Sequence, residues 1–191
     1  MNTITLNFNS VIDLDDEQFY QLCQSNPKLK FERNANKELI IMSPTGGITG
    51  KYNSDINTDL NLWNRKAKLG IVFDSSTGFK LPNGADRSPD AAWIALEKWN
   101  QLTIDQQEKF VPLCPDFVIE LRSISDNLIT LQDKLKEYID NGTRLGWLIN
   151  PKDKQVEIYR QGRPKEILNQ PSSLSGENVL PNFILNIESL W

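Results

Sequence analysis

The sequence predicts an α/β fold, in which helices pack against a sheet, on three observations. Residues 115–151 contain two apolar segments of strand length on either side of an amphipathic helical segment. Residues 29–42 have the pattern of a β-hairpin, and residues 49–67 have that of a long amphipathic helix. Strand and helix periodicities that alternate along one chain are typical of a sheet covered by helices. The strand–helix–strand unit also suggests a parallel crossover.

The elements before residue 110 follow from periodicity and from turn residues. Acidic residues from Asp13 to Glu17 suit the first turn of a helix, and asparagines at 34 and 36 suit a hairpin turn. Pro89 favours extended backbone at the residue before it, so a strand is expected to follow, with Asp90, Ala92 and Ile94 on one face. In chain order we expect a helix ending near 25–27, strands at 29–33 and 38–42, a helix at 49–67, strands at 71–73, 77–81 and about 90–94, and helical turns at 97–100 and 105–109.

Residues 115–151 form the unit around which we expect the rest to be organised. Apolar residues alternate along 116–122, and the other face of this strand carries Asp116, Glu120 and Arg122. Burying so many charged side chains on an inner strand is unfavourable unless they serve a purpose beyond packing. A helix follows at 128–140, with Ser125 or Asp126 as its N-cap, and then a buried strand at 145–149. Residues 155–159 pair with that strand as a hairpin, and short strands complete the chain.

Length and composition restrict the class of protein. The 191 residues suit one domain spanning 1–191, and the net charge of −4 argues against a protein that coats nucleic acid by bulk electrostatics. Cys23 and Cys114 lack metal-ligand spacing and are expected to be reduced thiols in a cytoplasmic protein. No signal peptide and no apolar run of membrane-spanning length is found.

The absence of histidine excludes several reaction types. Serine–histidine and cysteine–histidine hydrolases and histidine-ligated zinc sites all need a side chain that this sequence lacks. Proton transfer therefore falls to carboxylates, lysine, tyrosine or metal-bound water.

Three residues in chain order point to such chemistry: Asp90, Glu120 and Lys134. Two carboxylates on neighbouring strands repel each other unless a cation joins them. Magnesium suits this arrangement because it binds a few carboxylate oxygens and keeps several waters, one of which can attack a phosphodiester. A nearby lysine would orient that water or offset charge on the phosphate.

The chain resembles the Uma family of restriction endonucleases, within the PD-(D/E)XK nuclease superfamily. The resemblance rests on Pro89-Asp90, PDFVIELRS at 115–123, KLKEY at 134–138 and NGTRLGWLINP at 141–151. It implies a restriction-endonuclease-like mixed sheet flanked by helices, a metal-dependent endonuclease that hydrolyses DNA, and Mg²⁺ or Mn²⁺ as cofactor. It places the metal ligands on Asp90 and Glu120 and the catalytic lysine on Lys134.

The sequence departs from the superfamily at two places. Arg122 stands where a lysine is usual, two residues after the glutamate, and could form an ion pair with Glu120 or contact a phosphate. The first core helix, where many members carry an acidic or polar ligand, offers Asp55 and Asp59 as its nearest acids, and no ligand is assigned there.

Each of these residues also has a purely structural interpretation. Asp90 could open a strand, Glu120 could be an exposed strand charge, Lys134 a solvated helix charge, and Tyr138 a packing residue. A second hypothesis is therefore a non-catalytic binding or assembly module with the nuclease fold. A homodimer is expected by resemblance and because the tail is apolar, at Leu180, Phe183, Ile184 and Trp191, although these residues could instead complete the monomer core.

Overall fold

The structure is a computed structural model that describes residues 3–8, 11–12 and 14–191. Its helices are α1 (Asp16–Ser25), α2 (Gly47–Ala67), α3 (Leu96–Trp99), α4 (Ile104–Glu108) and α5 (Leu128–Asp140), with a final 3₁₀ turn at Glu188–Leu190. Its strands are β1 (Thr3–Leu6), β2 (Lys30–Arg33), β3 (Leu39–Met42), β4 (Gly70–Asp74), β5 (Phe79–Lys80), β6 (Asp86–Arg87), β7 (Ala91–Ala95), β8 (Phe117–Leu121), β9 (Leu145–Asn150), β10 (Gln155–Arg160), β11 (Glu166–Asn169), β12 (Ser173–Ser175) and β13 (Ile184–Asn186).

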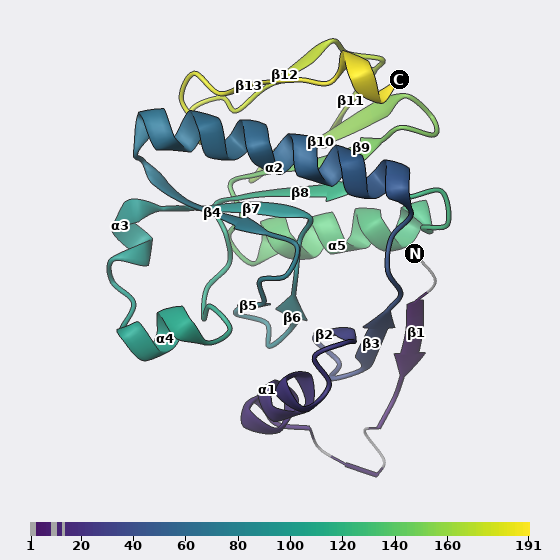
Figure 1. Cartoon of the computed structure of the whole chain (residues 1–191), viewed down its shortest axis with the longest axis vertical. Helices are drawn as coiled ribbons and strands as arrows, with labels where there is room; N and C mark the ends of the chain where they lie inside the picture. The colour runs from purple at the N-terminus through teal and green to yellow at the C-terminus, as the bar shows by residue number, and fades with distance from the viewer. Residues whose placement is uncertain (1–2, 9–10, 13) are drawn as a thin grey trace.

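The main sheet is mixed, as the resemblance implied. Its strand order is β11-β10-β9-β8-β7-β4, and β8 pairs with β9 in parallel while the other pairs are antiparallel. Helices α2 and α5 cover its opposite faces (Figure 1). The crossover from β8 through α5 to β9 is therefore present at 115–151, with the predicted helix boundaries of 128 and 140 confirmed.

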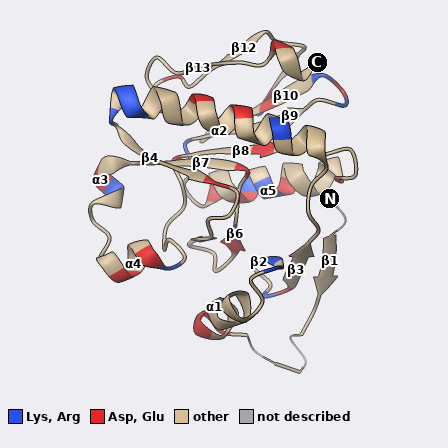
Figure 2. Cartoon of the chain, viewed as in Figure 1, with Lys and Arg blue, Asp and Glu red and all other residues tan. Residues whose placement is uncertain are grey.

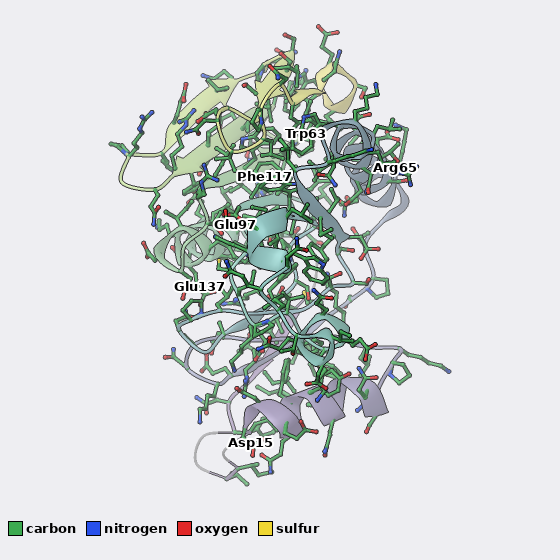
Figure 3. All side chains as sticks on the ribbon, turned by 90° about the vertical axis from the view of Figure 1, so that its left-hand side faces the viewer. Asp15, Trp63, Arg65, Glu97, Phe117 and Glu137 are labelled. Carbon is green, nitrogen blue, oxygen red and sulfur yellow. The ribbon has the colours of Figure 1, made fainter. Side chains whose placement is uncertain are left out.

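Two apolar cores lie on the two faces of this sheet. Alternate strand residues such as Phe117, Ile119 and Trp147 pack with Ile56 and Leu60 of α2 and with the C-terminal segment. The intervening strand residues, such as Val118 and Leu148, pack with Leu135 and Tyr138 of α5. In Figure 3, Trp63 and Phe117 lie in the first of these layers, and Glu137 of α5 lies below them, nearer the small sheet. Glu120 follows the period of Val118 and therefore belongs to the α5 face.

A smaller antiparallel sheet lies beside α5 and contains the predicted hairpin. Its strand order is β1-β3-β2-β6-β5, with β2 and β3 paired around Asn34, whose side chain accepts hydrogen bonds from the backbone N–H groups of Asn36 and Glu38. The hairpin prediction is confirmed. In this sheet β2 lies near α5, although the two elements are about a hundred positions apart in the sequence.

Helix ends explain small differences from the predicted boundaries. Asn127 caps α5 through hydrogen bonds from Ile129 and Thr130, so Ser125 and Asp126 are not the cap. Gly142 has φ +112°, a conformation that lets the chain reverse after α5 at little steric cost. Asp15 and Gln18 form a capping box at α1, and Asp13, which we included in this helix start, lies outside the described residues.

The apolar tail completes the monomer core. Leu180 and Phe183 are buried, and Trp191 packs against the same core, while Ile184 is exposed. The surface argument for a dimer was therefore wrong for the first two residues. Cys23 and Cys114 are free thiols, and the described residues contain no helix long and apolar enough to cross a membrane.

Candidate active site

The structure brings the three predicted site residues to one cavity. Asp90 directly precedes β7, Glu120 lies in β8, and Lys134 lies in the second turn of α5. Ala91 pairs with Ile119, so extending the antiparallel register by one residue places Asp90 opposite Glu120. All three side chains line a cavity of about 560 Å³ between α5 and the small sheet. Asp90 and Glu120 thus lie at neighbouring positions of adjacent strands and line the same cavity, and the expectation that their carboxylates share one ion stays a prediction.

Lys134 joins two carboxylates in the interior. Its Nζ lies 2.8 Å from Glu120 Oε1 and 2.8 Å from Glu32 Oε1, and all three side chains are nearly buried. Lys134 is therefore not a solvated helix charge. One ammonium group is divided between two carboxylates, so it cannot offset both of their charges fully.

Glu32 of β2 is a site residue that the sequence did not reveal. Besides Lys134, it accepts hydrogen bonds from the Arg87 guanidinium (3.1 Å) and from the backbone N–H of Ser88 (2.9 Å). Arg87 in turn donates to Glu137 on α5 over 2.6 Å. Figure 2 shows acidic and basic residues close together on α5, the helix that carries Lys134 and Glu137. Nothing in the local pattern of β2 signals that its glutamate meets a helix 102 positions later.

Tyr138 has a polar role in addition to packing. Its side chain is buried one turn after Lys134, and its hydroxyl donates to Glu120 Oε1 over 3.2 Å. Glu120 Oε1 thus receives both Lys134 and Tyr138. This arrangement holds the carboxylate of Glu120 in one orientation toward the cavity.

Asp90 is held by donors from two other elements. Its Oδ2 accepts the backbone N–H of Leu121 over 2.8 Å, and its Oδ1 accepts Nδ2 of Asn53 in α2 over 3.1 Å. Each carboxylate oxygen has a second lone pair, so both can still bind an ion.

Burial and charge shift the pKa values of these groups in different directions. Burial raises the pKa of Glu120 to about 7, and the neighbouring Asp90 and Glu32 add to the effect while Lys134 opposes it. Burial acts on Glu32 in the same direction, but Lys134 and Arg87 outweigh it and lower the pKa to about 2. Burial alone would lower the pKa of Lys134, yet Glu120 and Glu32 raise it, so the amine stays protonated at neutral pH. Burial also raises the pKa of Asp90.

The lining of the cavity has an excess of negative charge. Among the described residues that line it, seven are acidic and three are basic, the latter being Lys30, Arg87 and Lys134. A concave surface with this imbalance attracts cations more readily than phosphates. The cavity therefore needs additional positive charge before it can receive a polyanion.

Hard carboxylate oxygens of this kind fit magnesium or manganese. Magnesium uses one or two carboxylates and keeps several waters, a coordination that Asp90 and Glu120 can supply from adjacent strands. Among the residues that the structure describes, no group of three or more histidine, cysteine, aspartate or glutamate side chains is placed to hold a metal ion. Lys134 lies against the carboxylate of Glu120.

The remaining predicted residues lie away from this cluster. Arg122 does not pair with Glu120; it pairs with Asp153 over 2.8 Å, because the backbone turns at the end of β8 toward the β9–β10 turn. Asp55 of α2 is exposed and pairs with Lys51, and Asp59 is exposed too. Asp116 is buried and accepts Lys98 and the N–H of Ala95, so it is a structural residue at the start of β8.

The chain is similar in fold to a solved crystal structure. A crystal structure described as "a putative nuclease belonging to DUF820" from Anabaena variabilis has a TM-score of 0.71 and 18% sequence identity, and the match covers 84% of this chain and 88% of that one. No curated protein matches the chain.

The family model named Uma2, described as "Putative restriction endonuclease", matches residues 16–188, which include Glu32, Asp90, Glu120 and Lys134. This match extends over most of the sequence, and the nuclease-like fold and the acidic cavity agree with it. The resemblance noted from the sequence motifs is confirmed, and the chain belongs to the Uma2 family of restriction-endonuclease-like proteins.

Proposed function

We propose that this protein is a metal-dependent endonuclease that hydrolyses phosphodiester bonds in DNA, with Asp90 and Glu120 as metal ligands and Lys134 as the catalytic lysine. The observation that carries the proposal is the convergence of these three side chains on one acidic cavity, from the residue before β7, from β8 and from α5. Family membership supports nuclease activity, and the choice of DNA as substrate rests on the family description.

The proposed division of labour follows from the charges. Magnesium or manganese, when bound, would supply an activated water and offset charge on the phosphate. Asp90 and Glu120 would hold the ion, and the hydrogen bonds from Leu121 and Tyr138 keep their carboxylates oriented for it. Lys134 remains protonated because its pKa is raised, so it would act as a cation and hydrogen-bond donor toward the phosphate rather than as a base.

A second candidate function is a non-catalytic binding module. It is favoured by the closed ion-pair network in which Lys134 already links Glu32 and Glu120, because a structural role would use the same contacts. The acidic lining of the cavity also disfavours a nucleic acid unless cations are bound.

Plasmid nicking combined with calorimetry separates the two functions. We expect the wild-type protein to nick supercoiled plasmid with Mg²⁺ or Mn²⁺ and to be inactive with a chelator. Glu120→Gln should abolish both ion binding and cleavage, since one carboxylate is a weak magnesium ligand. Lys134→Met should still bind the ion but cut about a hundredfold more slowly or worse, the scale for losing one preorganised electrostatic contact.

Lys136→Met is the matched control for Lys134→Met. Lys136 lies on the same helix and is exposed, paired with Asp133 over 2.9 Å. We expect this variant to cut at the wild-type rate. If the wild-type protein binds no divalent ion, or if Lys134→Met cuts as fast as Lys136→Met, the nuclease proposal is wrong and the binding module takes its place.

Assembly and location complete the proposal. A homodimer would let two sites cut both strands of a duplex, and sedimentation at micromolar concentration tests it; a monomer would remove this part only. Activity in the cytoplasm is consistent with the free thiols of Cys23 and Cys114.

A further inference from the structure

We infer that Asn53 and Asn57 of α2 are positioning residues that fix Asp90 for ion binding. They lie on the first core helix, where many superfamily members carry an acidic or polar ligand. The inference rests on the proposed function for its link to the ion, and on the contacts below for the positioning itself.

The two asparagines donate hydrogen bonds to different atoms of Asp90. Nδ2 of Asn53 donates to the carboxylate oxygen Oδ1 over 3.1 Å, and Nδ2 of Asn57 donates to the backbone carbonyl oxygen of Asp90 over 3.0 Å. The backbone N–H of Leu121 holds the other carboxylate oxygen over 2.8 Å. The side-chain orientation and the backbone of Asp90 are thus both fixed, from α2 on one side and from β8 on the other.

Asn53 and Asn57 lie one helical turn apart, so the two donors face the same segment. Asn57 is itself held, because its Nδ2 also donates to the backbone carbonyl of Asn53 over 3.0 Å. The pair therefore acts as one rigid support on the helix. α2 needs no such pair for its own stability, since its apolar face at Ile56 and Leu60 packs on the main sheet.

The oxygen atoms of these two side-chain amides indicate that the amides are placed for their Nδ2 donor groups. Within the described part of the chain, Oδ1 of Asn53 and Oδ1 of Asn57 are buried and have no hydrogen-bond partner. Burying an amide oxygen without a partner is unfavourable, and an apolar side chain would avoid it. The Nδ2 contact with Asp90 accounts for the position of the Asn53 amide, and contacts with Asp90 and with the Asn53 carbonyl account for that of Asn57.

Groups that orient a metal ligand without touching the ion usually change ion affinity by about tenfold to a hundredfold when removed. We therefore expect Asn53→Ala and Asn57→Ala each to weaken Mn²⁺ binding by about tenfold or more in calorimetry. Asn61→Ala is the matched control, because Asn61 lies one turn further along α2 and, within the described residues, its Nδ2 donates over 2.9 Å to the helix carbonyl of Asn57 and not to Asp90. This variant should keep its affinity for the ion.

A second readout needs no metal. The ¹³C resonance of the Asp90 carboxyl, in isotope-labelled ion-free protein, should shift in Asn53→Ala and stay in place in Asn61→Ala. If Asn53→Ala folds poorly, Asn53→Asp keeps the size of the side chain and replaces the donor by an acceptor. It should move the Asp90 resonance further, with Asn61→Asp as the charge-matched control.

The outcomes separate this inference from the proposed function. An unchanged Asp90 resonance in the Asn53 variants, or equal loss of Mn²⁺ affinity in Asn61→Ala, overturns the positioning role. Wild-type protein that binds no Mn²⁺ overturns the proposed function, and the Asp90 resonance alone then decides whether Asn53 positions it. Weaker binding confined to Asn53→Ala and Asn57→Ala, with the resonance shift, supports both.

Discussion

Glu120→Gln should change how the stability of the ion-free protein depends on pH. Glu120 is buried, and its pKa in the folded protein is about 7 against 4.5 for the ordinary group. Because the pKa of Glu120 is higher in the folded than in the unfolded protein, the group contributes stability that is fully present below pH 4.5. This stability is lost as the pH rises through 7. Glutamine keeps the shape of the side chain but cannot ionise, so the variant does not lose this stability as the pH rises.

The size of this change in stability follows from the pKa shift. A difference from 4.5 to about 7 corresponds to about 3.5 kcal/mol at most, at about 1.4 kcal/mol per pKa unit. We therefore expect the free energy of unfolding of Glu120→Gln, relative to wild type, to rise by roughly 2–3 kcal/mol between pH 5 and pH 8. The folded-state pKa values of Glu32 and Lys134 lie outside this range, so these groups contribute a nearly constant amount.

Urea unfolding of both proteins at half-unit pH steps, with a chelator present, measures this difference. Glu157→Gln is the matched control with the opposite sign. Glu157 is also a buried strand glutamate, and although burial opposes it, its hydrogen bonds from Tyr159, Lys165 and Gln132 lower its pKa. Ionised Glu157 contributes stability above pH 4.5, so the Glu157→Gln variant should lose more stability at neutral pH than at low pH. A Glu120→Gln difference that is flat between pH 5 and pH 8 would refute the electrostatic account of the site.

Three further outcomes test the packing and the reactivity of the chain. Phe183→Ala should lose about 3–5 kcal/mol of stability with no change in oligomeric state, as unfolding and sedimentation together would show, because Phe183 packs on Trp63 and Trp147 in the monomer core. Gly70→Ala should destabilise the fold by about 1–3 kcal/mol or more in thermal unfolding, since an added Cβ would lie 2.1 Å from the carbonyl oxygen of Ile94. Cys114 should resist alkylation at neutral pH until the protein unfolds, because burial raises the pKa of its thiol to about 11, and labelling followed by mass spectrometry would detect any early reaction.

The sequence was sufficient for elements whose signals are local. The helix at 128–140 has apolar spacing and a stop at Asn141-Gly142, and the hairpin at 29–42 has its asparagine turn, so both were found with accurate limits. The strand pair that carries Asp90 and Glu120 followed from alternation and from the two Pro-Asp steps.

Contacts between distant segments were beyond the reach of such patterns. Glu32 reaches Lys134 only because the small sheet folds back toward α5, and no spacing in β2 indicates this. Arg122 shares a strand period with Glu120, yet the strand ends between them and the arginine turns to Asp153. Asn53 and Asn57 of α2 contact Asp90, which follows them by 37 and 33 positions, and no spacing within the helix indicates these contacts.

The antiparallel register of β7 and β8 has a consequence for how this chain can tolerate change during evolution. Ala91 is paired with Ile119, and strand side chains alternate between the two faces. One residue inserted within β7 or within β8 would turn Asp90 or Glu120 from the α5 face to the α2 face while leaving the apolar content of the strands almost unaltered. Residues 100–109 of the connection between these strands are mostly exposed and are the part of it that can take small insertions. Length variation among descendants of this sequence should therefore accumulate in that connection, and a single-residue insertion inside either strand should produce a folded protein without ion binding.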